Sequence, residues 1–265
     1  MTTVSAPRRF GRTAVRVLIA LALVVVLVVV GFLAWASTPM RGERGAAIEV
    51  WTNPSVQVTS TPHSIVMAPT SGVSTSRSSG LVFIPGARVD PYAYMFVMSG
   101  IVEAEGVTVV ITKPTLNLAF FDTRPLSEFT ADAPDVANWY VGGHSLGGVR
   151  SCMLADSPTP GVVGAEVSGL ILFASYCAND LSGSGLPVLS IGGSNDLLST
   201  PQKIADGAPL LPSDTLFIEI EGANHAQFGN YGLQPGDGEA TISSEQQRTE
   251  ITRALAAFLS AGTTE

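Results

Sequence analysis

Residues 139–148 read WYVGGHSLGG, a short apolar run followed by small residues around a serine. The aromatic and β-branched residues favour a short strand, and residues 147–154 favour a helix. Between them lies the pattern G-x-S-x-G, from Gly143 to Gly147. A strand that turns sharply into a helix tolerates only small residues at the turn, and it exposes the serine hydroxyl at the carboxyl edge of a sheet. The stretch therefore predicts Ser145 as a nucleophile.

Around this stretch, apolar runs of strand length alternate with segments of helical character. The expected strands are 48–51, 56–58, 65–67, 81–84, 107–112, 139–141, 170–175, 188–191 and 216–220. The expected helices are 91–105, 147–154, a short one around Ala205, and 243–259 with Ser243 as N-cap. Strands that are apolar almost throughout and alternate with helices predict an α/β fold, with a mostly parallel sheet flanked by helices.

A serine nucleophile needs a general base, and the chain contains three histidines. His63 lies in the early β-rich region, away from the strands that would carry a site. His144 adjoins Ser145, and adjacent side chains leaving a strand point to opposite faces. By elimination, His225, in the loop after the last expected strand, is the predicted base.

The imidazole of such a base is held in one tautomer by a carboxylate. Asp196 follows the expected strand 188–191 through a short loop at the same sheet edge. The chain order Ser145, Asp196, His225 is the order expected after a strand–turn–helix of this kind. Asp180, after the preceding strand, is the alternative carboxylate. An N-cap for the following turn is a second role open to Asp196.

Two backbone N–H groups are expected to face the oxygen of the carbonyl that the serine attacks. One is the N–H of Leu146, at the start of the expected helix. The second is expected in the loop at residues 85–88, where Gly86 lets the backbone approach a substrate closely. Ala87 is the favoured donor in this loop, and Arg88 is the alternative.

The N-terminal residues predict a membrane segment. Residues 17–36 carry no charge, and twenty helical residues span ~30 Å, the thickness of a bilayer's hydrocarbon core. Four arginines and no acidic residue precede this run, so residues 1–16 are expected in the cytoplasm and the body outside it. The Ala-Trp-Ala sequence at 34–36 resembles a signal-peptide cleavage site. Secretion after cleavage near Ala36 is therefore the alternative to an uncleaved single-pass anchor.

The rest of the chain is acidic. Four of the 14 basic residues precede residue 39, which leaves 10 basic and 22 acidic residues and a net charge near −12. A body of this charge argues against nucleic acid as a partner. Residues 37–47 are small and polar, and they are expected to link the membrane segment to one α/β domain over residues 48–262.

Several motifs together resemble the α/β-hydrolase superfamily and, within it, the dienelactone-hydrolase-like branch called α/β-hydrolase family 5. The resemblance spans about residues 80–260. The segments that carry it are 83–94, 142–148, 193–196, and 224–232 followed by 234–237, of which the last pair is the most specific. Dienelactone hydrolases proper use a cysteine where this chain has Ser145, so their substrate does not carry over.

This resemblance implies a triad of Ser145, Asp196 and His225. The triad would cleave a small ester-like or other acyl substrate through an acyl-enzyme on Ser145, without a cofactor. Lids in this superfamily follow the sixth strand, and residues 177–186 are too few for one, so an open site is expected. Acyl transfer to a lipid or cell-wall alcohol and a non-catalytic binding protein on the same fold are the alternatives. Substrate identity and oligomeric state stay open.

Cysteine usage gives two further expectations. Cys152 and Cys177 are the two cysteines of the chain, and outside the cytoplasm they could form a disulfide. Pairing requires α-carbons within ~7 Å, and two buried free thiols are the alternative. No cluster of histidine and cysteine in the sequence predicts a metal site.

Overall fold

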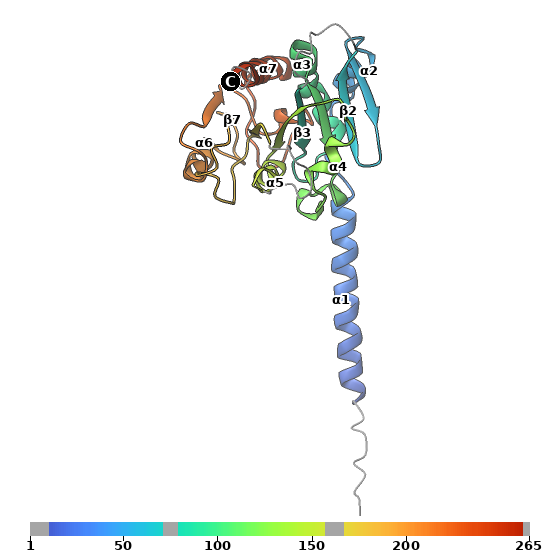
Figure 1. Ribbon diagram of the computed structural model, residues 1–265. Helices are drawn as coiled ribbons and strands as arrows, with labels where there is room; N and C mark the ends of the chain where they lie inside the picture. Colours follow the sequence, from blue (N-terminus) through green and yellow to red (C-terminus); the bar gives the residue numbers. More distant parts are fainter. Residues whose placement is uncertain (1–10, 71–78, 157–166, 262–265) are drawn as a thin grey trace, which may run out of the picture. The chain divides into compact units, whose positions relative to one another are not determined.

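The computed structural model describes residues 11–70, 79–156 and 167–261 (Figure 1). The chain divides into two compact units, one ending at Thr38 and the body beginning at Pro39. In the first unit the described residues form α1 (Arg12–Ala36), whose most apolar stretch has a mean hydropathy of 3.4. This helix is long and apolar enough to cross a membrane or to serve as a signal sequence.

The body is built on one eight-stranded sheet with the order β1-β2-β4-β3-β5-β6-β7-β8. Strand β2 pairs antiparallel with both β1 and β4, and all other neighbours are parallel. The strands are β1 (Val56–Ser60), β2 (Ser64–Pro69), β3 (Ser79–Ile84), β4 (Thr108–Thr112), β5 (Asn138–His144), β6 (Gly169–Phe173), β7 (Val188–Gly193) and β8 (Leu216–Ile220). The mostly parallel sheet predicted from the sequence is confirmed.

Helices cover both faces of this sheet. The α-helices described in the body are α2 (Arg44–Thr52), α3 (Met95–Glu105), α4 (Leu126–Thr130), α5 (Leu146–Ala155), α6 (Pro201–Gly207) and α7 (Ser244–Ala261). Successive strand residues point to opposite faces, so β3 serves two cores. Leu81 and Phe83 join the core that includes α3 and α7, which lie side by side (Figure 1). Val82 and Ile84 join the core that includes α4 and α5.

The N-terminal part of the body differs from the sequence prediction. Residues 48–51, predicted as a strand, lie in α2. Val50 is buried, whereas Ile48 and Trp51 are about half exposed, a spacing that fits the helical period and not the alternation of a strand. The β-branched and aromatic residues of this segment suggested a strand, but burial of one helix face overrides such a propensity.

The segment 37–47, predicted as a linker, makes backbone hydrogen bonds to the body from Met40 onwards. The N–H of Met40 donates to the carbonyl of Arg88 at 2.7 Å, and the N–H of Asp90 donates to the carbonyl of Met40 at 2.8 Å. The N–H of Glu43 donates to the carbonyl of Asn230 at 3.0 Å. These bonds place the residues just before α2 against the loops that follow β3 and β8.

Two helix ends follow their sequence signals. The hydroxyl of Ser243 accepts the N–H of Gln246 at 3.1 Å, and the side chain of Gln246 accepts the N–H of Ser243 at 2.9 Å. This reciprocal pair is the capping box expected at the start of α7. The predicted helix 91–105 begins as a 3₁₀ turn and continues as α3, which ends at Gly106 with φ 67°. A left-handed residue at this position favours glycine.

Candidate active site

Ser145 lies on the turn between β5 and α5, with φ 51° and ψ −121°. Its N–H donates to the carbonyl of Phe173 in β6 at 3.0 Å. Two glycines permit the turn, because a Cβ on Gly143 would collide with the backbone of Gly147, and one on Gly147 would collide with the carbonyl oxygen of Ile84. The predicted strand–turn–helix is therefore present, with Ser145 partly exposed.

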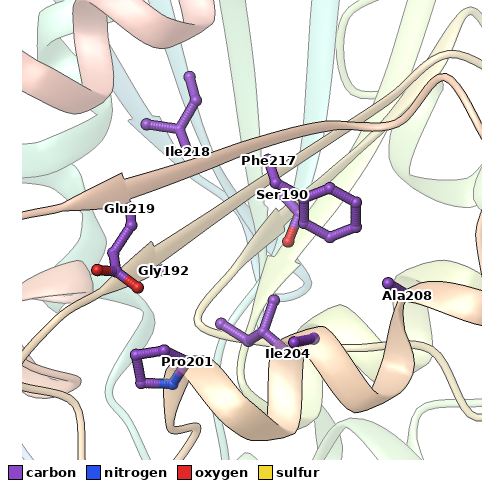
Figure 2. A pocket seen from close by; sticks show the side chains of 9 residues that line it. Ser190, Gly192, Pro201, Ile204, Ala208, Phe217, Ile218 and Glu219 are labelled. Atoms are coloured by element: carbon purple, nitrogen blue, oxygen red, sulfur yellow. The ribbon is translucent and has the colours of Figure 1, made fainter.

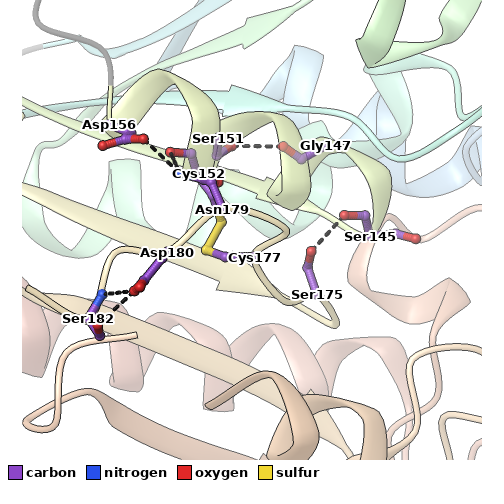
Figure 3. Close-up of a disulfide and its surroundings, with 10 residues drawn as sticks. All are labelled: Ser145, Gly147, Ser151, Cys152, Asp156, Ser175, Cys177, Asn179, Asp180 and Ser182. Atoms are coloured by element: carbon purple, nitrogen blue, oxygen red, sulfur yellow. Dashed lines mark hydrogen bonds between the residues drawn. A yellow bond between two sulfur atoms is a disulfide. The ribbon is translucent and has the colours of Figure 1, made fainter. Parts of the chain in front are cut away.

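The segment after β6 supports the same turn (Figure 3). The hydroxyl of Ser175 donates to the carbonyl oxygen of Ser145 at 2.7 Å. Two residues further on, Cys177 forms a disulfide with Cys152 of α5, with the α-carbons 5.6 Å apart. The pairing that the sequence leaves open is thus made, and it joins this segment covalently to the helix that follows Ser145.

Asp196 and His225 form a buried pair. Asp196 Oδ2 lies 2.7 Å from His225 Nδ1, and the two side chains are 0% and 2% exposed. Asp196 Oδ1 accepts the N–H groups of Leu198 at 2.8 Å and Ser199 at 2.7 Å. One carboxylate oxygen therefore caps the turn while the other faces the imidazole. Because Nδ1 is engaged by the carboxylate, Nε2 is the nitrogen of His225 that is left for other chemistry.

Asp180, the alternative carboxylate, bonds within its own turn. Its Oδ1 accepts the hydroxyl of Ser182 at 2.6 Å and the N–H of the same residue at 2.9 Å (Figure 3). The hydroxyl bond, with help from the N–H, lowers the pKa of Asp180. Among the described residues, the carboxylate that contacts the imidazole of His225 is that of Asp196.

The loop that carries His225 is held by a carboxylate twelve residues further along the chain. Asp237 Oδ1 accepts the N–H of His225 at 3.2 Å, and Oδ2 accepts the N–H of Ala226 at 2.9 Å. The N–H of Gln227 donates to Asn224 Oδ1 at 3.1 Å and closes the same turn. The motif at 224–237 marks this segment in the sequence, but it assigns no role to Asp237.

A buried network that the sequence did not predict joins the loop after β3 to the end of β5, next to Ser145. The N–H of Gly86 donates to the hydroxyl oxygen of Tyr94 at 2.8 Å, and this oxygen lies 2.9 Å from His144 Nδ1. The Tyr94 oxygen already accepts one bond, so its hydroxyl donates its own hydrogen bond to His144 Nδ1. With Nδ1 as an acceptor, His144 is the neutral Nε2–H tautomer. Burial lowers the pKa of His144 well below its ordinary value, and nearby His225 lowers it further.

His144 also brings the two halves of the candidate site together. Its ring centroid lies 4.4 Å from that of His225, so the predicted base packs against the residue that precedes Ser145. Within the described residues the Ser145 hydroxyl makes no hydrogen bond to another side chain. Catalytic hydrogen bonds are often long without substrate and tighten in the complex. The contact between His144 and His225 was not predicted, because residues 81 positions apart leave no local signal in the sequence.

The predicted oxyanion donors lie on two neighbouring segments. Gly147 packs against the backbone of Ile84, at the end of β3, so the start of α5 lies next to the loop at 85–88. Within this loop the N–H of Arg88 donates to the carbonyl of Asn117 at 2.7 Å. In the described part of the chain the N–H groups of Leu146 and Ala87 have no acceptor, and both residues are partly exposed. Ala87 is therefore the better placed of the two alternatives.

The remaining histidine lies elsewhere in the sheet. His63 is in the turn between β1 and β2, where its N–H donates to the hydroxyl of Thr61 at 3.1 Å. In residues 11–70, 79–156 and 167–261, no group of three or more His, Cys, Asp or Glu side chains is arranged to hold a metal ion.

Comparison with known families fits this geometry. Residues 80–249 match the alpha/beta hydrolase family, over more than half of the chain. The chain belongs to the alpha/beta hydrolase family. The resemblance to α/β-hydrolase family 5 drawn from the motifs is thereby confirmed, together with the fold it implies. Comparison with curated protein sequences finds no match.

Solved structures share this alpha/beta hydrolase fold at low sequence identity. A hyperthermophilic esterase from the archaeon Pyrobaculum calidifontis has a TM-score of 0.56 and 15% identity, over 81% of this chain and 87% of that chain. An alpha/beta hydrolase from the sediment metagenome of the Mar Chica lagoon, Morocco, has a TM-score of 0.54 and 15% identity, over 77% and 98%. A bacterial membrane phospholipase A has a TM-score of 0.52 and 14% identity, over 94% and 99%. The family match supports a hydrolase, and the solved structures share its fold.

Proposed function

We propose that this alpha/beta hydrolase is a serine hydrolase that cleaves a small ester-like substrate through an acyl-enzyme on Ser145. The observation that carries the proposal is the buried pair of Asp196 and His225, packed through His144 against the strained turn of Ser145. A buried carboxylate on Nδ1 fixes the tautomer in which Nε2 can accept a proton. This is the arrangement that a serine hydroxyl needs to become a nucleophile.

In the proposed reaction, His225 Nε2 takes the proton of the Ser145 hydroxyl as the oxygen attacks the substrate carbonyl carbon. The carbonyl oxygen becomes negatively charged and is held by the N–H groups of Leu146 and Ala87. The tetrahedral intermediate then collapses, and His225 passes its proton to the departing alcohol. Water, deprotonated by the same imidazole, attacks the acyl-enzyme and releases the acid. The carboxylate of Asp196 stabilises the imidazolium in both halves of the reaction.

Two features support a small substrate that reaches an open site. Residues 174–187, which join β6 to β7, contain no helix and are too few to form a lid domain. One of the similar structures is named as an esterase, which agrees with ester-like chemistry. We therefore expect short acyl esters to be better substrates than long ones.

We further propose that α1 is an uncleaved single-pass anchor and that the hydrolase body lies outside the cytoplasm. Four arginines precede the uncharged run at 17–36, which favours a cytoplasmic N-terminus. The disulfide between Cys152 and Cys177 is typical of an oxidising compartment. N-terminal sequencing of the protein isolated from membranes tests this, because cleavage near Ala36 would yield a new N-terminus and a soluble product.

The triad proposal is tested with the full-length protein in detergent. A fluorophosphonate probe is expected to label Ser145, and p-nitrophenyl acetate is expected to be hydrolysed. We predict that Ser145→Ala abolishes labelling and lowers kcat/KM about 10⁴-fold or more, because the nucleophile of a triad acts as a unit with its base. Ser213→Ala, which changes an exposed serine between α6 and β8, is the control.

The same experiment separates the alternatives. Folded protein that neither reacts with the probe nor hydrolyses esters would support a non-catalytic binding protein. Activity that survives Ser145→Ala would remove Ser145 from the reaction. Product analysis with an added primary alcohol distinguishes hydrolysis from acyl transfer, because a transferase would form the new ester in preference to the free acid.

A further inference from the structure

A cavity of about 310 Å³ lies between α6 and the edge of the sheet formed by β7 and β8 (Figure 2). Its apolar walls come from Phe217 on β8 and from Pro201 and Ile204 on α6, with the exposed Ala205 at its rim. None of the residues of the candidate active site lines it. The cavity is therefore a separate feature of the body, which the proposed hydrolysis does not use.

The floor of the cavity contains a polar group without a partner. Ser190 lies in the middle of β7 and is 1% exposed, and its hydroxyl makes no hydrogen bond within the described chain. Figure 2 shows this hydroxyl pointing from the strand towards Ile204 on α6. A buried hydroxyl is almost always paired, because leaving it unpaired costs the free energy of its desolvation. The position of Ser190 thus indicates a hydrogen-bonding group supplied from outside the chain.

The acidic side chain of Glu219 lies on the same face of the sheet as Ser190. In the pairing of β7 with β8, Ser190 lies opposite Phe217 and Gly192 lies opposite Glu219. Residues two apart on a strand share a face, so the Glu219 side chain lies on the face of Ser190, one pair further along. The Glu219 carboxylate has no ion-pair partner among the described residues. Lys203, the basic residue of α6, donates instead to the carbonyl of Leu198 at 2.8 Å.

We propose that this cavity binds a small amino alcohol with an apolar body. The ammonium group lies beside Glu219, the apolar body packs against Phe217 and the apolar residues of α6, and the hydroxyl pairs with Ser190. The volume suits a single aromatic ring with a short side chain. The charge of Glu219 selects against carboxylates of the same shape, because like charges repel.

Three small probes test the proposal by isothermal titration calorimetry, with the full-length protein in lipid nanodiscs. 2-Amino-1-phenylethanol contains all three features. 2-Phenylethylamine lacks the hydroxyl, and we expect about five-fold weaker binding, which is the usual contribution of one hydrogen bond. Mandelate replaces the ammonium with a carboxylate, and we expect binding weaker by about tenfold or more, since the pair with Glu219 is lost and repulsion is added.

Variants locate the binding. Ala205→Trp fills the cavity from its exposed rim and is expected to weaken binding of the amino alcohol more than about tenfold. Ala104→Trp, at an exposed alanine of α3, is the matched control and is expected to bind normally. Ser190→Ala is expected to make the two amines bind equally. Glu219→Gln is expected to remove most of the discrimination against mandelate.

Several results would overturn the proposal. These are no heat of binding at millimolar amine, equal affinity for amine and carboxylate, or an affinity that Ala205→Trp leaves unchanged. An unaltered preference for the amino alcohol in Ser190→Ala would show that the hydroxyl is paired by water and would contradict the assignment equally. Labelling of Ser145 is measured separately, so failure here and failure of the proposed hydrolysis are distinguishable.

Discussion

Ser145 and His225 lie on two segments that are positioned in different ways. The turn of Ser145 is held by the close contact of backbone with backbone, which Gly143 and Gly147 permit, and by a disulfide on the next helix. The loop of His225 is held by polar side chains, with Asp237 bonding two N–H groups and Asp196 bonding the ring.

The difference predicts how a substitution affects each segment. Added volume displaces the first segment as a whole, because there is no space between α5 and the end of β3. Loss of a single hydrogen bond loosens the second segment without dismantling it. Substitutions at the Ser145 turn should therefore act on stability, whereas substitutions in the His225 loop should act on rate.

The largest effect is expected from Gly147→Ala, which breaks the first segment. The added methyl group would collide with the carbonyl oxygen of Ile84, so α5 must move away from the sheet. We predict a loss of more than about 4 kcal/mol in the free energy of unfolding, measured by urea denaturation, together with loss of fluorophosphonate labelling. Gly183→Ala is the control, because a Cβ there meets nothing within 4 Å. Equal urea midpoints for the two variants would disprove the steric account.

Removal of the disulfide tests the covalent support of the same segment. The double substitution Cys152→Ser and Cys177→Ser opens a loop of 25 residues. In the chain-entropy account this lowers the free energy of unfolding by about 3.5 kcal/mol. We expect the midpoint of urea unfolding to fall and to become insensitive to dithiothreitol, while the wild-type protein shifts when the reductant is added. A wild-type midpoint that ignores the reductant would indicate that the bond does not stabilise the folded body.

The elements of the central sheet could be predicted because each is specified locally. The turn at Ser145 depends on five consecutive residues, and strands buried on both faces are continuous apolar runs in the sequence. His225 could be predicted because the chain has few histidines, and Asp196 because it closely follows a strand. The structure places their side chains in contact, which chain order alone could only suggest.

What the sequence could not show depends on contacts between distant residues. Tyr94 and His144 meet across 50 positions, and neither residue is part of a pattern that specifies the other. Ile48 and Trp51 have strand-forming side chains, yet packing of Val50 makes the segment a helix. The unpaired hydroxyl of Ser190 is visible only once α6 is placed over β7.

A smaller effect is expected from Asp237→Asn, which weakens the second segment. The amide nitrogen of asparagine cannot accept the N–H of Ala226, so the loop of His225 loses part of its support. We predict a fall in kcat of about 30-fold, equivalent to about 2 kcal/mol, with little change in KM. Asp214→Asn, at an exposed position before β8, is the control. A variant that loses stability instead of rate would show that the two segments are held in the same way.

The smallest effect concerns His144, which lies where the two segments meet. Burial lowers its pKa in the folded state, so between that pKa and the ordinary value near 6.5 the unfolded chain binds a proton that the folded chain does not. This residue therefore makes the free energy of unfolding decrease as pH falls below about 6.5, by about 1.4 kcal/mol per pH unit. His144→Asn keeps an acceptor for Tyr94 but does not titrate. We predict that below pH 6.5 its free energy of unfolding falls less steeply with pH than that of the wild type, by this amount.

Urea unfolding of both proteins between pH 4.5 and 8 measures that difference. Above pH 7, His144 binds no proton in either the folded or the unfolded chain. The stability curves of the two proteins should therefore run parallel there, which serves as the internal control. Parallel curves at every pH would mean that His144 is solvated or charged in the folded state. In that case the hydrogen bond with Tyr94 would not fix a neutral tautomer of His144. The packing of this ring against His225 would then not hold the base at a fixed distance from the Ser145 turn.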